Sequence, residues 1–329
     1  MLPPRVSELR ILALRAGFHA LEPIQFPDYP GSTMRGVFGR AFRSAVCIVR
    51  GTDCAACLLS SRCAYAVAFE SFPPPEGPVM EGASRVPHPF VLAPPDGGFV
   101  PSGTGFSMGL TLIGRAVEQA PYHFLALETM GRFGFGKTRG RAHLEGIDFL
   151  LPDGSCRRVY DGATRRSNGI PSAPSLGDLV RPLPASPTRV TLSFLTPARL
   201  LEEGRPAAGL NFPAVLRAVV RRLCLLTGLY GAGREDFDRN PLQEAAGRVR
   251  MTASELRWHD WERWSARQGT RMKLGGYLGR ISFEGDLAPF APWLRAGSFV
   301  HVGKGSSFGL GKYECRFDVI NDPLPRKDH

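Results

Sequence analysis

The sequence predicts an α+β protein built from two ferredoxin-like halves in tandem. Strand-like segments alternate with helix-like segments in the order strand, basic helix, strand, glycine-rich loop, strand, and the second half repeats this order. The chain has 329 residues, which is the usual size of two domains. Since 43% of the residues are hydrophobic, each half can form a core.

The first half contains these elements in order. Residues 9–22 carry apolar side chains on both faces and predict a buried strand, whereas the spacing in residues 32–46 predicts an amphipathic helix. Residues 105–114 predict another strand, and residues 122–131 predict a helix that ends at glycine. The glycine-rich loop at 131–141 then leads into a strand.

The second half follows the same plan. Residues 189–200 alternate as a strand does, and residues 212–231 predict a long helix with proline near its start and glycine near its end. Residues 274–285 are strand-like. A second glycine-rich stretch at 301–314 leads into the last strand.

The segment 152–188 separates the halves. It is rich in Pro, Ser, Gly and Arg, a composition typical of a linker or a long connection. We therefore expect an N-terminal domain at 1–151, with a small cysteine-rich, metal-binding insertion at about 47–63, and a C-terminal domain at 189–329.

Charge and cysteine content indicate the partner and the compartment. The net charge of +11 favours a polyanionic partner, either nucleic acid or an acidic membrane surface. No apolar run approaches eighteen residues, so no membrane span is expected, and the N-terminal residues lack the features of a secretory signal. Seven unevenly spread cysteines argue against a secreted disulfide framework. We expect a cytoplasmic protein.

The two glycine-rich loops match no nucleotide motif. The stretch 301–314 fits neither the P-loop nor the dinucleotide fingerprint, so a nucleotide cofactor is disfavoured. Glycines let backbone N–H groups approach phosphates, and neighbouring basic side chains attract a phosphodiester backbone. A hairpin turn with solvated lysines is the alternative. The predicted contacts are Lys137, Arg139, Arg141, Gly303, Lys304, Gly305, Gly309, Gly311 and Lys312.

Four stretches carry a family resemblance, namely "GSTMRGVFGRAF" at 31–42, the loop at 131–141, residues 258–283 and "HVGKGSSFGLGKYE" at 301–314. Together they resemble the CRISPR-associated RAMP superfamily, and within it the Cas-six family of precursor-crRNA processing endoribonucleases. The resemblance spans nearly the whole chain. It implies two ferredoxin-like domains, a basic surface that binds CRISPR repeat RNA, and RNA contact by the C-terminal glycine-rich loop.

The helix at 32–46 adds basic residues to this surface. We expect Arg35 and Arg40 to hold phosphates, unless they form only a solvated basic face. The cleavage that the resemblance implies leaves a guide RNA with a short repeat-derived 5′ tag.

Four cysteines lie close together in the sequence, with the spacing C-x6-C-x2-C-x5-C. Four thiols in a short segment of a cytoplasmic protein predict a structural zinc site, and an iron–sulfur cluster is the chemical alternative. The four could also be reduced thiols without a metal. A zinc ion held by four thiolates has no open position for catalysis. The cysteines are Cys47, Cys54, Cys57 and Cys63.

RNA cleavage without a metal needs a base for the 2′-OH proton, a donor for the 5′-oxygen and a cation near the phosphorus. The resembling family often carries a histidine at its first helix, but residues 24–63 contain none. The candidates are His301 at the start of the C-terminal loop, Tyr29 before the first helix, and His19 late in the first strand. A structural hydrogen bond is the alternative for both histidines, and the other histidines, including His259, are weaker candidates.

These observations predict a CRISPR repeat RNA endoribonuclease that uses no catalytic metal. Attack by the 2′-OH would leave a 2′,3′-cyclic phosphate and a 5′-hydroxyl. The alternative is a catalytically inactive RAMP subunit that holds crRNA together with the other subunits of a CRISPR effector complex. Membrane-surface or general anion binding would explain the charge but not the paired loops.

Overall fold

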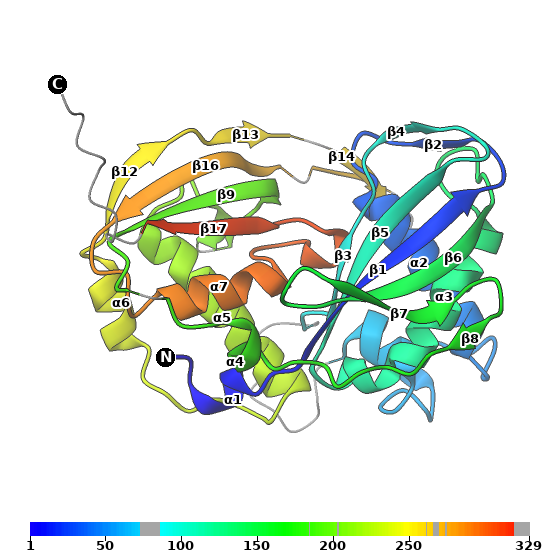
Figure 1. The fold of residues 1–329 in the computed structure, drawn as a ribbon, viewed down its shortest axis with the longest axis horizontal. Coiled ribbons are helices and arrows are strands. Elements are labelled where there is room, and N and C mark those ends of the chain that lie inside the picture. The colour runs from blue at the N-terminus through cyan, green and yellow to red at the C-terminus, as the bar shows by residue number, and fades with distance from the viewer. Residues whose placement is uncertain are drawn as a thin grey trace.

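The two large sheets of the computed structural model are antiparallel, and each is covered on one face by two helices (Figure 1). In each half, the four main strands follow the spatial order second, third, first, fourth, with the helices after the first and third strands. This is the ferredoxin-like arrangement, so the predicted tandem fold is confirmed. The structure describes residues 1–72, 86–183, 185–202, 204–260, 262–265, 270–273 and 275–318.

The first sheet has the order β3-β5-β1-β6-β7-β8. A short helix, α1 (Pro4–Ser7), precedes it, and the pair β2 (Ile24–Phe26) and β4 (Gly98–Val100) lies outside it. Its strands and two covering helices are β1 (Ile11–Ala20), α2 (Gly31–Val46), β3 (Phe90–Ala93), β5 (Gly105–Ile113), α3 (Ala120–Phe133), β6 (Ala142–Leu150), β7 (Cys156–Asp161) and β8 (Arg166–Ser167).

The second sheet has the order β12-β16-β9-β17, and the short strand β13 (Arg257–His259) also pairs with β16. A small helix, α6 (Asn240–Ala246), follows the first long helix of this half. The strands and two covering helices are β9 (Arg189–Ala198), α5 (Phe212–Tyr230), β12 (Arg250–Ser254), β16 (Gly276–Glu284), α7 (Ala291–Val300) and β17 (Tyr313–Asp318).

Three elements of this arrangement were not predicted from the sequence. The strands β3 and β12 have four and five residues, and the ten-residue helix α7 contains a proline and an internal glycine. Such short segments have little local periodicity, and their partners in the fold define them. The predicted linker at 152–188 also contains regular structure, because β7 pairs with β6 and β8 with β7. The domain boundaries stay a prediction.

The helix α2 shows how the first core forms. Its apolar residues at spacings of three and four, Met34, Val37, Phe38, Ala41 and Phe42, are all buried against the sheet and α3. Burial of this stripe leaves the opposite face of α2 to solvent, including Gly36 and Arg40. Among the described residues, no helix is long and apolar enough to cross a membrane.

The C-terminal glycine-rich loop packs between the two halves (Figure 1, after α7). Its short 3-10 turn at Ser306–Phe308 contacts both α2 and β3 of the first half. The hydroxyl of Tyr29 donates a hydrogen bond of 2.9 Å to the carbonyl oxygen of Phe308. On the other side, the hydroxyl of Thr196 donates to the carbonyl oxygen of Gly309 over 2.7 Å. The loop therefore joins the first half to β9 of the second.

The backbone path of this loop requires glycine at several positions. Gly303, Gly305, Gly309 and Gly311 all have φ between 71° and 89°, the left-handed region that side chains disfavour. A Cβ atom on Gly311 would also collide with the carbonyl oxygen of Val302. Close packing and backbone conformation, rather than flexibility, explain the glycine content of this stretch.

Substitution of Gly311 by alanine tests this explanation. We expect Gly311→Ala to lower the free energy of unfolding by about 2 kcal/mol or more, because it adds both backbone strain and a collision. Chemical denaturation measures the change. Gly209→Ala is the matched control, since a Cβ there meets no atom within 4 Å. Equal stability of the two variants would contradict the structural role of Gly311.

Two histidines are buried in the fold. His123 on α3 is fully buried beside Phe42, and its Nδ1 donates a 2.9 Å hydrogen bond to the carbonyl oxygen of Gln119. His301 follows α7, is 6% exposed, and its Nδ1 donates over 3.2 Å to the carbonyl oxygen of Leu310. Burial lowers the pKa of His123 to about 4. Burial and the nearby Arg222 lower the pKa of His301 to about 3.

These lowered pKa values predict a loss of stability in mild acid. An unfolded histidine titrates near pH 6.5, so between about pH 6.5 and 4 the unfolded chain binds more protons than the folded chain. The free energy of unfolding should fall as the pH decreases, by up to about 1.4 kcal/mol per pH unit for each buried histidine. Denaturation at pH 7.0, 6.0 and 5.0 measures this slope. His123→Gln should flatten it, and His143→Gln, at an exposed position, should not.

Candidate nucleic-acid interface

A cleft of about 1020 Å³ lies between the two halves. The first half contributes α2, the turn before it and the loop after α3, and the second half contributes the end of β9, the end of β13 and part of β16. The side chains and backbone that line the cleft belong to Pro27, Asp28, Tyr29, Ser32, Thr33, Gly36, Val37, Arg40, Gly134, Gly136, Arg139, Leu195, Thr196, Pro197, His259, Asp260 and Leu278.

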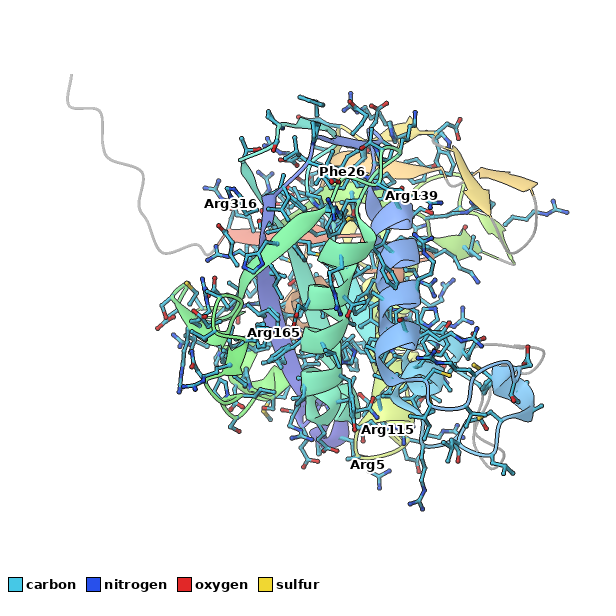
Figure 2. The ribbon with its side chains drawn as sticks, turned by 90° about the vertical axis from the view of Figure 1, so that its right-hand side faces the viewer. Arg5, Phe26, Arg115, Arg139, Arg165 and Arg316 are labelled. Carbon is cyan, nitrogen blue, oxygen red and sulfur yellow. The ribbon has the colours of Figure 1, made fainter. Side chains whose placement is uncertain are left out.

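The first half supplies two arginines to the cleft. Arg40 is on the exposed face of α2, and Arg139 is exposed in the loop after α3, where Figure 2 shows it beside the first turns of α2. Gly134 and Gly136 of that loop have φ of 76° and 68°, which turns the loop toward the cleft. Ser32 and Thr33 line the same wall.

The second half supplies an imidazole and a carboxylate. His259 ends β13, where it pairs with Gly276 of β16, and its side chain is exposed. Asp260 follows it and accepts a 2.8 Å hydrogen bond from the indole Nε1 of Trp258. Among the histidines that the structure describes, His259 is the one that lines the cleft. The cleft thus combines a proton-transfer group with two arginines and two aspartates.

The three catalytic candidates from the sequence lie in different environments. Tyr29 lines the cleft, but its hydroxyl is engaged with Phe308, and burial raises its pKa. His301 is buried and anchors the glycine-rich loop, which is the structural role that the sequence left open. His19 is on the solvent face of the first sheet, with Nδ1 3.8 Å from Oε1 of Glu145. Of the three, only Tyr29 reaches the cleft.

His259 is a cleft residue that the sequence ranked among the weaker candidates. Its position in the aromatic stretch 258–261 indicates packing, and nothing in the local sequence indicates that it shares a cleft with α2. The signal that could have found it is the family resemblance of residues 258–283, which applied to the segment but not to a single residue. Trp261 and residues 266–269 of this segment lie outside the described residues.

The predicted RNA-binding residues also divide into groups. Arg40 and Arg139 line the cleft. Arg35 is held within the protein, with its guanidinium 5.1 Å from the ring centre of Phe308 and NH2 2.8 Å from Nε2 of His88. Arg141 forms an ion pair with Glu22, at 2.6 Å between NH2 and Oε1. Arg40 and Arg139 are therefore better placed for phosphate binding than Arg35 and Arg141.

The remaining basic residues are on the two loops. Lys137 and Lys304 are exposed but do not line the cleft. Lys312 is half-buried, and its backbone N–H donates to the hydroxyl of Thr196 over 2.8 Å. Gly303 and Gly305 are half-buried, whereas Gly309 and Gly311 are buried. The C-terminal loop is a packed segment with one exposed lysine, and RNA contact by its glycines stays a prediction.

The four cysteines of the insertion are all partly exposed, and all lie in described residues. Burial is the main cause of a raised pKa at Cys54, and the nearby thiols of Cys63 and Cys47 contribute to it. Among the described residues, no group of three or more histidine, cysteine or acidic side chains forms a site that could hold a metal ion. Structural zinc or an iron–sulfur cluster at these four cysteines stays a proposal.

Both the sequence and the fold of the chain are similar to those of known proteins. Residues 9–171 match the family model AF_1859_N, described as an N-terminal domain, and residues 192–313 match the model "CRISPR-associated endoribonuclease Cas6". No curated protein matches the sequence. Solved structures with the same fold include Thermus thermophilus Cas6, with 15% identity and a TM-score of 0.54 over 94% of this chain and 99% of that chain.

Two further solved structures are similar at the level of fold. A Cas6 product complex has 14% identity and a TM-score of 0.55, over 92% of this chain and 98% of that chain. A partial Cas6-RT-Cas1–Cas2 complex has 14% identity and a TM-score of 0.59 over 98% of this chain, which spans 48% of the matched chain. The second half of the chain therefore matches the Cas6 endoribonuclease model, and the chain has the fold of solved Cas6 structures along nearly its whole length, in agreement with the resemblance seen in its sequence motifs.

Proposed function

We propose that the chain is an endoribonuclease that processes CRISPR repeat RNA, with the cut made in the cleft between the two halves. The observation that carries this proposal is the presence of His259 in the same cleft as Arg40 and Arg139. A proton-transfer group from one half and guanidinium groups from the other can act on one phosphodiester. The match of residues 192–313 to the Cas6 endoribonuclease model supports RNA as the substrate.

The cleft residues suggest how the reaction proceeds. His259 takes the proton of the 2′-OH, whose oxygen bonds to the adjacent phosphorus as the bond to the 5′-oxygen breaks. A hydroxyl of Ser32 or Thr33, or a water, protonates the leaving 5′-oxygen. Arg40 and Arg139 stabilise the charge on the phosphorane oxygens. The products are a 2′,3′-cyclic phosphate and a 5′-hydroxyl, and no catalytic metal is required.

A catalytically inactive RAMP subunit that only holds crRNA is the second candidate. The absence of histidine from residues 24–63, where the family often carries one, favours it. In that case the chain would assemble with other subunits of a CRISPR effector complex. The two candidates differ in whether bound repeat RNA is cut.

Substitution of His259 separates the two candidates. In EDTA, we expect the protein to cleave its cognate repeat RNA but not a copy with a single 2′-deoxy nucleotide at the scissile position. His259→Ala should lower the single-turnover cleavage rate by about 100-fold or more, because general acid–base catalysis contributes that much. His143→Ala, at an exposed position outside the cleft, is the control.

The outcomes have distinct meanings. Tight binding of the repeat RNA without cleavage would support the inactive subunit. Cleavage by His259→Ala at the rate of the unmodified protein would contradict the role of His259. Cleavage of the 2′-deoxy RNA would contradict attack by the 2′-OH.

Gly36 offers an independent test of the cleft as the RNA site. It lies within α2 on the cleft wall, and a Cβ atom there meets nothing within 4 Å, so the packing of the protein does not require glycine. Gly36→Ala should raise the free energy of unfolding by about 0.5–1 kcal/mol. A methyl group at a surface that contacts RNA should weaken RNA binding by about fivefold, or about 1 kcal/mol.

Gly228 in α5 provides the matched control. It also lies within a helix, outside the cleft, and a Cβ there meets its nearest atom, Cα of Arg234, at 3.7 Å. Gly228→Ala should stabilise the protein without changing RNA affinity. Denaturation and fluorescence anisotropy with labelled repeat RNA measure the two effects. If Gly36→Ala binds RNA as tightly as Gly228→Ala, RNA does not approach this wall of the cleft.

A further inference from the structure

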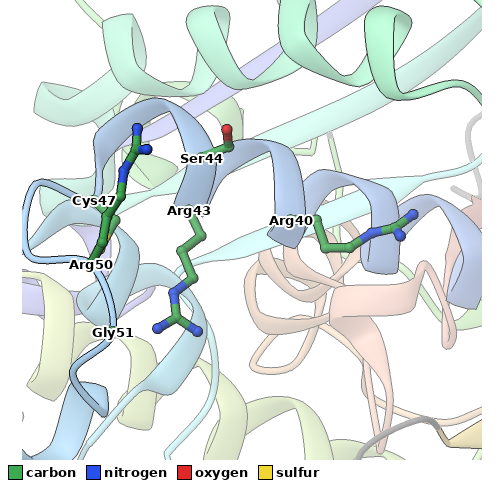
Figure 3. A pocket seen from close by; sticks show the side chains of 6 residues that line it. All are labelled: Arg40, Arg43, Ser44, Cys47, Arg50 and Gly51. Carbon is green, nitrogen blue, oxygen red and sulfur yellow. The ribbon is translucent and has the colours of Figure 1, made fainter.

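A second hollow lies at the other end of α2 (Figure 3). It has a volume of about 410 Å³ and is formed by the last turns of α2 and the first residues of the cysteine-rich insertion. The residues that line it are Arg40, Arg43, Ser44, Cys47, Arg50 and Gly51. Half of them are arginines, whereas no carboxylate is present.

The charge of this hollow is not balanced within the protein. In the described part of the chain, no carboxylate forms an ion pair with Arg40, Arg43 or Arg50. The interdomain cleft differs, because its two arginines share the lining with Asp28 and Asp260. The uncompensated positive charge of the hollow therefore attracts a polyanion.

Neutral groups hold one of these arginines in place. The guanidinium of Arg43 lies 5.7 Å from the ring centre of Tyr65, and its NH2 donates to the carbonyl oxygen of Thr52 over 3.5 Å. These contacts orient the side chain but leave its charge uncompensated. Figure 3 shows Arg43 pointing toward Gly51 and Arg40 extending in the other direction along the helix. The arginine side chains diverge rather than converge on one point, which suits an extended strand better than a single compact anion.

The hollow and the cleft are neighbours on α2. Arg40 lines both of them. From Gly36 in the cleft, the exposed face of α2 passes through Arg40 to Arg43, at helical spacings of four and three residues. With a rise of about 1.5 Å per residue, this face leads a strand about 10 Å from the cleft to the insertion. An RNA strand that leaves the cleft along α2 meets the hollow next.

We propose that this hollow is a second phosphate-binding subsite, which holds the sugar–phosphate backbone of RNA outside the cleft. The inference rests on the proposed function, since it assumes that RNA occupies the cleft. In this arrangement the cleft supplies the groups for chemistry, and the arginines of the hollow supply affinity for the flanking strand. The cysteine-rich insertion is then part of the RNA-binding surface, because it contributes Arg50 and Gly51.

The experiment compares two RNAs and two double variants. The short RNA contains only the nucleotides around the cut site, and the long RNA extends it by roughly ten nucleotides on each side, within the range that one basic groove binds. The test variant is Arg43→Ala with Arg50→Ala. The control removes the same charge with Arg166→Ala and Arg316→Ala, which are exposed and outside both hollows. Anisotropy titrations at several salt concentrations give Kd and its salt dependence.

We expect the test variant to bind the long RNA about tenfold more weakly, with the slope of log Kd against log salt reduced by about 1.4 for two lost phosphate contacts. Binding and cleavage of the short RNA should stay within about twofold of the unmodified protein. The control variant should show neither change. An unchanged Kd and slope for the long RNA would overturn the proposal, and so would an equal loss with the short RNA.

Crosslinking of the unmodified protein gives a second measurement that needs no variant. Long RNA with a photoreactive uridine at successive positions outside the cut site should crosslink to the peptide that contains residues 43–51. Crosslinks to this peptide at none of these positions would also overturn the subsite. Failure of the cleft proposal is distinguishable, because the short RNA would then be neither bound nor cut.

Discussion

The cleft of this protein depends on the packing of the C-terminal glycine-rich loop between the two sheets. The loop leaves α7, passes α2 and β3 of the first half, and returns to pair as β17 with β9. Hydrogen bonds from Tyr29 and Thr196 to carbonyl oxygens of the loop connect it to both halves. Gly303, Gly305, Gly309 and Gly311 have positive φ, and glycine adopts this backbone conformation without strain. The relative position of the walls of the cleft follows from this packing.

The distribution of partners decides which charges are available to a ligand. An arginine that is half-buried within the protein or ion-paired with a carboxylate is less available to a phosphate than an exposed arginine without a carboxylate partner. Arg35, between aromatic rings and beside His88, and Arg141, paired with Glu22, are in that position. Arg40 has no such partner among the described residues and lines both hollows along α2. The positive charge that is available to a ligand therefore lies along the exposed face of α2, and the number of basic residues alone does not predict it.

The proposed reaction does not require a histidine on the first helix. What it requires is a proton-transfer group within reach of the same phosphodiester that the cations contact. In this chain the second half brings His259 to the cleft through β13, a strand that pairs with β16. The cleft receives side chains from both ferredoxin-like halves, so the histidine can come from the second half instead of the first helix.

The sequence by itself determined the elements with strong local periodicity, including the strand at 9–22 and the helices at 32–46 and 212–231, and its motifs predicted the family. Local spacing is sufficient for these features because it defines which face of an element is apolar. The tertiary structure alone decided which side chains share a site. His301 begins a basic loop in the sequence yet is buried, whereas His259 lines the same cleft as α2. The burial of a side chain and its contacts depend on residues that are distant in the chain, so the local sequence does not predict them.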